Sequence, residues 1–282
     1  MPADAAAGTA RRADPASPCE TGAPPGGGSS SRVERRGARS PAPRVLVDGV
    51  DDLLAGASGA PRTSGALRVL DLGGGTGGLA VRLASGGHDV VVVDPSPDAL
   101  AALARRADEE GVADRLTGVQ GDAESLPDHV ADASVDLLLC HGVLEVVDDP
   151  ARALRACRRA LRPTGRLSVL VAGRGGAVLA RVGSGHLRQA RALQADPDGR
   201  WGPQDPLQRR FDAGGVQHLL AGAGFSVLRT EGVGVLSALV PRGGPAVDPA
   251  AAQALEDLER AASTDPSLLG VAGSLHLHAA PV

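Results

Sequence analysis

Short apolar runs alternate with amphipathic stretches through the middle of this chain. These runs predict strands at 67–72, 88–93, 116–120, 135–140 and 166–172. Stretches with apolar residues three or four positions apart predict helices at 45–54, 78–85, 97–111, 149–161 and 213–223. Strands that alternate with helices in this way form a parallel sheet covered on both faces.

The end of the chain departs from this alternation. After a polar stretch and the helix at 213–223, a strand is predicted to begin at 225–229 and to resume at 233–239. A helix at 249–262 then leads to a last strand near 275–279. We therefore expect an α/β fold: a seven-stranded, mostly parallel Rossmann-like sheet with helices on both faces and a closing antiparallel strand.

Composition divides the chain and restricts its partners. Residues 1–38 are rich in Ala, Pro, Gly, Ser and Arg, which predicts a disordered tail ahead of one domain at 39–282. The net charge of −4 argues against a protein that coats nucleic acid by charge alone. The three widely spaced cysteines fit neither a disulfide framework nor a zinc site, so we expect a cytoplasmic protein without a metal. No apolar run is long enough to predict a membrane span.

The first strand leads into a glycine-rich turn, Leu72-Gly73-Gly74-Gly75-Thr76-Gly77. Glycines at 73, 75 and 77 let the backbone turn tightly and approach a ligand without a Cβ in the way. A dinucleotide-binding turn has the spacing Gly-x-Gly-x-x-Gly, whereas this one is Gly-x-Gly-x-Gly. Asp71, just before the turn, would repel a pyrophosphate and would suit a cationic amino group. A turn that binds nothing is the alternative.

Acidic residues follow the next two strands. Asp94 ends the second strand and can accept hydrogen bonds from both ribose hydroxyls of a nucleoside. It also fits the N-cap of the following helix, and the two roles are compatible. After the third strand come Asp122, Ala123 and Glu124, where an acid can accept from the exocyclic amine of adenine and small residues leave room for the ring.

His141 ends the fourth strand. Ligands of such sheets bind at the carboxyl ends of the strands, so we expect His141 where a cofactor and its acceptor meet. A cofactor contact, a general base and a purely structural role are all open to it.

These motifs, in this order, resemble the class I S-adenosylmethionine-dependent methyltransferases over residues 66–172. The resemblance rests on Leu-Asp-Leu-Gly-Gly-Gly-Thr-Gly at 70–77, Val-Val-Asp at 92–94, Gly-Asp-Ala-Glu at 121–124 and Leu-Arg-Pro-Thr-Gly-Arg-Leu at 161–167. Within it, the segment 140–150 resembles the bacterial tRNA 5-carboxymethoxyuridine methyltransferases, as do 204–207, 223–225, 230–235 and 255–259. Val146 stands where that family has a tryptophan.

The resemblance implies S-adenosylmethionine as the cofactor. It implies contacts to the cofactor from Gly73, Gly74, Asp94, Ala123, Glu124 and His141, and from an arginine ahead of the first strand, for which Arg39 is the nearest match. It also implies that the acceptor is a carboxylate on a modified wobble uridine of tRNA. Such an acceptor needs no general base, so His141 would only orient the reactants.

The segment 173–212 is expected to be a substrate-side insert or lid. It carries seven arginines, four of them offset by aspartates. Arginines suit a phosphate backbone or a carboxylate, and the single tryptophan could stack on a base. The candidate substrate-binding residues are Arg174, Arg181, Arg188 and Trp201. A solvated lid is the alternative.

Three other functions compete with tRNA methylation. A methyltransferase of a small metabolite or natural product would be favoured by a hydrophobic rather than a basic lid. The glycine spacing and Asp71 argue against a nicotinamide-dependent dehydrogenase. A nucleoside-binding module without catalysis can be distinguished only by assay.

Overall fold

A computed structural model describes residues 41–57, 65–240 and 248–282. The expected tail at 1–38 and Arg39 lie outside these ranges, so their predictions stay predictions. In the part of the chain that is described, no helix is both long and apolar enough to cross a membrane.

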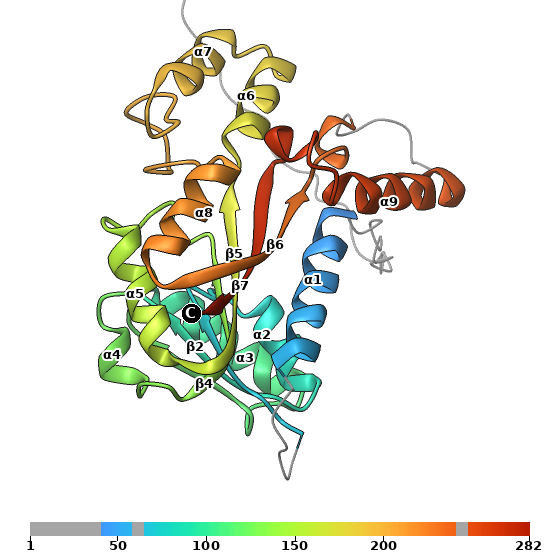
Figure 1. Cartoon of the computed structure of the whole chain (residues 1–282). Helices are drawn as coiled ribbons and strands as arrows, with labels where there is room; N and C mark the ends of the chain where they lie inside the picture. The colour runs from blue at the N-terminus through green and yellow to red at the C-terminus, as the bar shows by residue number, and fades with distance from the viewer. Residues whose placement is uncertain (1–40, 58–64, 241–247) are drawn as a thin grey trace, which may run out of the picture. The chain divides into compact units, whose positions relative to one another are not determined.

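Seven strands form one mixed sheet (Figure 1). Their order across the sheet is β3 (Leu116–Gln120), β2 (Asp89–Asp94), β1 (Arg68–Leu72), β4 (Val135–His141), β5 (Leu161–Ala172), β7 (Ser274–Pro281) and β6 (Phe225–Val233). The first five are parallel, and β7 is antiparallel to both of its neighbours. The predicted mostly parallel sheet with a closing antiparallel strand is confirmed.

Helices cover both faces of the sheet, which explains why its central strands read as unbroken apolar runs. On β4, Leu137 and Leu139 belong to one core, whereas Leu138 and Cys140 belong to the other. The first core lies under α1 (Pro41–Ala57), α2 (Gly78–Ser85) and α3 (Pro97–Glu109). The second lies under α4 (Leu126–His129), α5 (Pro150–Ala160) and α8 (Ala213–Gly222). A further helix, α9 (Pro249–Ser263), packs on α1.

One prediction about the second half of the chain was wrong. The strand expected at 233–239 ends at Val233, and Ser237–Leu239 is a 3-10 turn instead. The cause is Glu259, a fully buried carboxylate of α9 that accepts hydrogen bonds from the backbone N–H groups of Val235, Leu236 and Ser237. These donors are therefore not free to pair with a strand.

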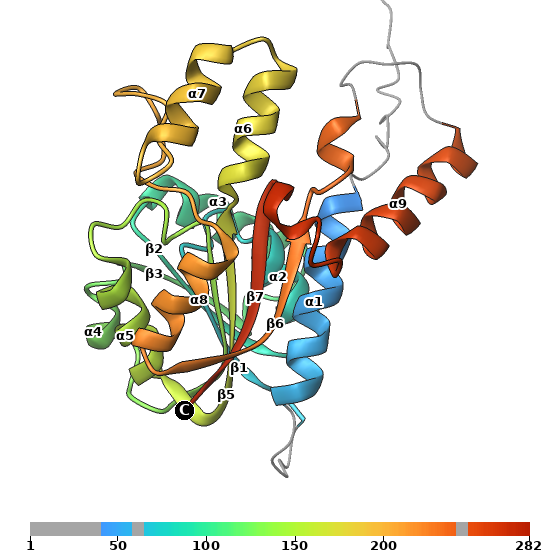
Figure 2. The ribbon, with the colours of Figure 1, turned by 45° about the horizontal axis from the view of Figure 1, so that its top comes forward.

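The segment expected to be an insert or lid contains two helices for which the sequence analysis made no prediction. They are α6 (Arg174–Gly183) and α7 (Leu187–Ala195), which lie side by side beyond the end of β5 (Figure 2). The glycines around both short helices hid their apolar spacing in the sequence.

Candidate functional site

The glycine turn joins β1 to α2 and adopts the strained backbone that its glycines allow. Gly73, Gly75 and Gly77 have φ values of 71°, 56° and 74°, in the left-handed region. Gly77 precedes the first turn of α2, and a Cβ there would overlap Leu103 of α3. At Gly75 only the Asp94 carboxylate comes within 4 Å of a Cβ position. The turn is therefore tight against α3 and open at Gly75.

Asp94 fastens this turn to β2. Its Oδ2 accepts from Gly75 N at 2.8 Å, and its Oδ1 accepts from Ser96 N at 2.9 Å. Ser96, not Asp94, is the N-cap of α3, so the helix-cap alternative for Asp94 was wrong. The two backbone donors fix the carboxylate and leave each oxygen a second lone pair for a ligand hydroxyl.

Asp71 lies beneath the turn with 5% of its surface exposed. The backbone of Gly74 packs directly on it, since a Cβ at Gly74 would be 2.5 Å from Asp71 Oδ2. Burial, and then the charge of Asp94, raise the pKa of Asp71 to about 7. A cation bound at the turn would favour the ionised form of this carboxyl group.

The segment after β3 meets the same edge, because Gly121 N donates to Asp94 O at 3.2 Å. Asp122 Oδ1 accepts from the backbone N–H groups of Ser125 and Glu124, which lower the pKa of Asp122. Ala123 is buried, whereas the exposed Glu124 pairs with Arg152 at 3.2 Å. The Asp122 carboxylate thus shapes the turn that carries Ala123 and Glu124.

His141 ends β4 at this edge and is half-buried. Its Nε2 lies 2.8 Å from Ser168 Oγ of β5. Burial, and then the neighbouring His276 ring, lower the pKa of His141 to about 3. The imidazole is neutral at physiological pH and a weak proton acceptor. Two residues on, Val143 lies so close to Gly73 that a Cβ on the glycine would be 2.6 Å from Val143 Cγ2.

The structure thus brings the glycine turn, Asp71, Asp94, the 121–124 segment and the end of β4 together at one edge of the sheet. It does not place the four insert candidates in that cluster. Arg174 donates to Pro197 O within the insert, and the Arg181 guanidinium lies 4.9 Å from the centre of the Trp201 ring. Arg188 is exposed on α7.

Other cations of the insert hold the fold together. Arg209 donates to Leu144 O at 2.9 Å, and Arg210 forms a buried ion pair with Asp205 at 2.7 Å. An open hollow of about 650 Å³ lies on the insert and is lined by Ala192, Ala195, Asp196, Pro197, Arg200, Trp201, Gly202 and Pro203.

Comparison with known proteins identifies the class to which this fold and edge belong. Residues 70–169 match the family described as "Methyltransferase domain", a segment that includes the glycine turn, Asp94 and His141. The chain therefore contains a methyltransferase domain with the class I S-adenosylmethionine-dependent fold, as the sequence predicted.

The tRNA 5-carboxymethoxyuridine methyltransferase of Escherichia coli is 32% identical over 178 residues, 60% of this chain and 63% of that protein. The chain thus spans less than two thirds of that relative's length. The crystal structure of the [4+2]-cyclase SpnF has a TM-score of 0.52 at 25% identity, covering 83% of this chain and 80% of that one. The structure of geranyl diphosphate methyltransferase in complex with sinefungin has a TM-score of 0.56 at 15% identity. The match covers 84% of this chain and 78% of that one.

S-adenosylmethionine is the cofactor of this class, and the residues at the edge fit it. The turn is open above Gly75, and at Gly142 no atom of a described residue outside its chain neighbours lies within 4 Å of a Cβ position. The carboxylate of Asp94 suits a ribose diol, and that of Asp71 suits a cationic amino group.

Sequence reasoning missed a set of polar residues behind His141. Ser168 lies between His141 Nε2 and His276 Nε2, at 2.8 and 2.7 Å. His276 in turn lies beside Glu231 and His278. The alternation Leu275-His276-Leu277-His278 was the available signal, since it puts two histidines on one face of a strand.

Proposed function

We propose that this protein transfers a methyl group from S-adenosylmethionine to a carboxylate, on a modified uridine of tRNA. One observation carries the methyl-transfer part: the Asp94 carboxylate is fixed by Gly75 N and Ser96 N at an open glycine turn. The cofactor supplies an activated methyl group, so the protein mainly has to position the reactants and exclude water.

We assign three contacts to the residues of this edge. Asp94 accepts hydrogen bonds from the ribose hydroxyls, and Asp71 faces the cationic amino group. The 121–124 turn, with the buried Ala123 as its floor, lies against the adenine. We also keep Arg39 as a contact to the cofactor, as the family resemblance implies.

A carboxylate acceptor agrees with the state of His141. This histidine has a pKa of about 3 and its Nε2 is engaged by Ser168, so it is poorly suited to remove a proton. A carboxylate is already ionised at neutral pH and needs no such base. The similarity to a tRNA carboxymethoxyuridine methyltransferase supports the same acceptor.

Substitution of Asp94 tests the cofactor site. Asp94→Ala removes two charged acceptors, and each such hydrogen bond contributes about 1.5–3 kcal/mol. We expect S-adenosylmethionine affinity, measured by calorimetry, to fall at least about tenfold, with a smaller effect on turnover at saturation. Asp98→Ala, an exposed aspartate on α3, is the matched control. Unchanged affinity in Asp94→Ala would refute the assignment.

A second acceptor, a small apolar molecule, is favoured by the surface of the insert. Leu179, Val182 and Leu187 are 39%, 47% and 63% exposed on α6 and α7. The arginines at 174, 209 and 210 are meanwhile used inside the fold.

Nucleoside mass spectrometry separates the two acceptors. A strain that lacks the gene should lose one methylated uridine from its tRNA, and purified protein with S-adenosylmethionine should restore it in vitro. An unchanged nucleoside profile would overturn the tRNA acceptor and favour the small molecule. Binding of S-adenosylmethionine by the purified protein is the control that keeps methyl transfer separate from the choice of acceptor.

A further inference from the structure

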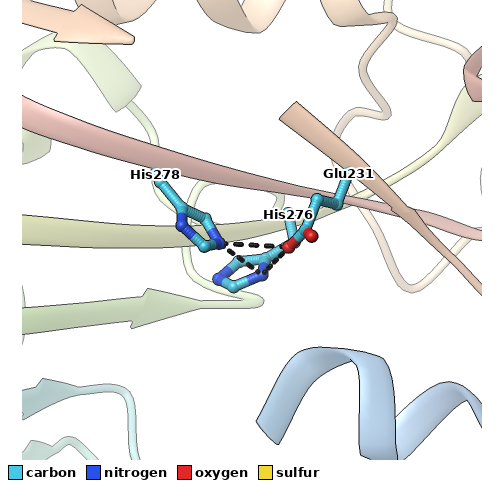
Figure 3. Close-up of side chains that lie close together, drawn as sticks. All are labelled: Glu231, His276 and His278. Carbon is cyan, nitrogen blue, oxygen red and sulfur yellow. Dashed lines mark hydrogen bonds and ion pairs between the residues drawn. The ribbon is translucent and has the colours of Figure 1, made fainter. Parts of the chain in front are cut away.

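Glu231, His276 and His278 form a buried cluster on the last two strands of the sheet. Glu231 of β6 is the register partner of His276 on β7, and His278 lies two residues further along the same face. The three side chains are 7%, 0% and 5% exposed and point toward one another (Figure 3). We propose that these three residues bind a divalent first-row transition-metal ion such as Zn²⁺.

The spacing of the three ligand atoms fits such an ion. His278 Nε2 is 3.1 Å and His276 Nδ1 is 3.5 Å from Glu231 Oε2, and the two nitrogens are 3.3 Å apart. Zinc binds histidine nitrogen and carboxylate oxygen at about 2.0–2.2 Å in a tetrahedral arrangement. The edge of a tetrahedron is about 1.6 times the distance from centre to corner, so neighbouring ligand atoms lie roughly 3.3–3.5 Å apart at such a site. One ion can therefore touch all three atoms.

The buried oxygen Glu231 Oε2 depends on the two imidazoles alone. His278 Nε2 lies 3.1 Å and His276 Nδ1 lies 3.5 Å from it, and no other hydrogen-bond donor among the described residues reaches it. The contact between His276 Nδ1 and His278 Nε2 can hold only one proton. The two facing nitrogens and the carboxylate oxygen thus share few protons, and a bound cation would engage the lone pairs of all three atoms at once.

The surroundings are those of a metal site. His276 Nε2 lies 2.7 Å from Ser168 Oγ, and a histidine that binds a metal through one nitrogen usually donates from the other. On the opposite side, α1 comes so close that a Cβ at Gly49 would lie 2.8 Å from Glu231 Oε2. Arg229 pairs with the other oxygen, Glu231 Oε1, at 3.2 Å, and so leaves Oε2 for the ion.

The donor set indicates the kind of ion. Two imidazoles and one carboxylate favour zinc and its neighbours over Mg²⁺ or Ca²⁺, which prefer oxygen ligands. Three protein ligands leave a fourth position for water. The expectation that the protein holds no metal rested on the spacing of the cysteines alone. The proposed site contains no cysteine, so it departs from that expectation.

The site also reaches the end of β4. With a metal on His276 Nδ1, His276 Nε2–H donates to Ser168 Oγ, and the Ser168 hydroxyl donates to His141 Nε2. His141 then carries its proton on Nδ1 and acts as a donor. Only this consequence touches the proposed function; the metal site stands without it.

The test uses the full chain without a histidine tag, treated with a chelator and then dialysed. We expect it to bind one equivalent of Zn²⁺ by calorimetry, and Co²⁺ with the absorption of a four-coordinate site. His278→Gln and Glu231→Gln should each weaken Zn²⁺ binding by at least about tenfold. His218→Gln, on an exposed histidine of α8, is the matched control and should bind as the wild type does.

Wild-type protein that takes up no stoichiometric Zn²⁺ or Co²⁺ would overturn the proposal and leave a cluster held by protons alone. Binding that survives both substitutions would also overturn it. Circular dichroism first establishes that the variants fold. If they do not, the wild type decides: stoichiometric Co²⁺ with a four-coordinate spectrum supports the site, and its absence refutes it.

Discussion

The buried carboxyl group of Asp71 makes the stability of this domain depend on pH in a direction opposite to that of most acids. Burial and the charge of Asp94 raise its pKa from 3.8 to about 7. Between these two values the folded state holds a proton that the unfolded state has released. The contribution of Asp71 to stability is therefore greatest at low pH and declines as the pH rises through 7.

Asp71→Asn removes this dependence. The raised pKa corresponds to a loss of about 4 kcal/mol from the free energy of unfolding once the pH is above 8 and Asp71 is ionised in both states. About 2–3 kcal/mol of this loss falls between about pH 5 and pH 8. We expect urea unfolding without cofactor to show that Asp71→Asn gains stability over the wild type by this amount as the pH rises across that interval.

Asp114→Asn is the matched control, because Asp114 is an exposed carboxylate just ahead of β3. Its difference from the wild type should stay the same at both pH values. An Asp71→Asn variant whose stability relative to the wild type does not change with pH would show that Asp71 is not a buried acid with a raised pKa.

The same substitution should act in the opposite direction on binding. If Asp71 faces a cationic group, the wild type binds S-adenosylmethionine more tightly at pH 8 than at pH 6, because the carboxyl group is then ionised. Asp71→Asn should bind more weakly, and its affinity should not follow this change. A variant that gains stability relative to the wild type as the pH rises but binds the cofactor less well shows a combination that general damage to the fold does not produce. A variant that retains the wild-type pH dependence of binding would contradict the role of Asp71.

Three further substitutions, the first with a matched control, test other contacts. Gly77→Ala should lower the free energy of unfolding by roughly 2–5 kcal/mol, from left-handed strain and overlap with Leu103. Gly87→Ala, also left-handed but in open space, should lose only about 1–2 kcal/mol, and equal losses would rule out the overlap. Glu259→Gln should lower the free energy of unfolding in urea by about 1–3 kcal/mol and speed the exchange of the backbone amides at 235–237. Exchange as slow as in the wild type would show that Glu259 does not hold these three N–H groups. Arg188→Ala should reduce the salt dependence of tRNA binding by about one unit of slope without changing cofactor affinity, and an unaltered slope would remove Arg188 from the acceptor site.

The elements around the glycine turn could be predicted from sequence because their signals are local. The helix predicted at 78–85 matches α2, and the strand predicted at 116–120 matches β3. Both are short, periodic and bounded by glycine or polar residues. The role of Asp94 illustrates the limit of such signals: its sequence position suited a helix cap, and only the structure shows Ser96 in that place.

The second half of the chain depends on contacts between distant segments. Glu259 ends the β6 strand pairing from a helix more than twenty residues away in the chain, so no local pattern shows that the strand stops at Val233. Three of the insert arginines, at 174, 209 and 210, bond to carbonyl groups or to Asp205 inside the fold. Charge counts describe composition, but they do not tell whether a cation points outward or inward.

Polar residues on the two closing strands, β6 and β7, are linked by hydrogen bonds to the end of β4. A face of β7 and β6 packed under a helix would be expected to be apolar, yet it carries Glu231, His276 and His278 beneath α1. Ser168 joins these side chains to His141, and its partner His276 lies 108 residues away in the chain. The hydrogen bond between His141 and Ser168 is therefore linked, on the same face of the sheet, to His276, which lies outside the match over 70–169. If the cluster binds a metal, removing the ion should alter the proton position on His141, and nitrogen-15 spectra of its ring can test that with or without a methyl acceptor.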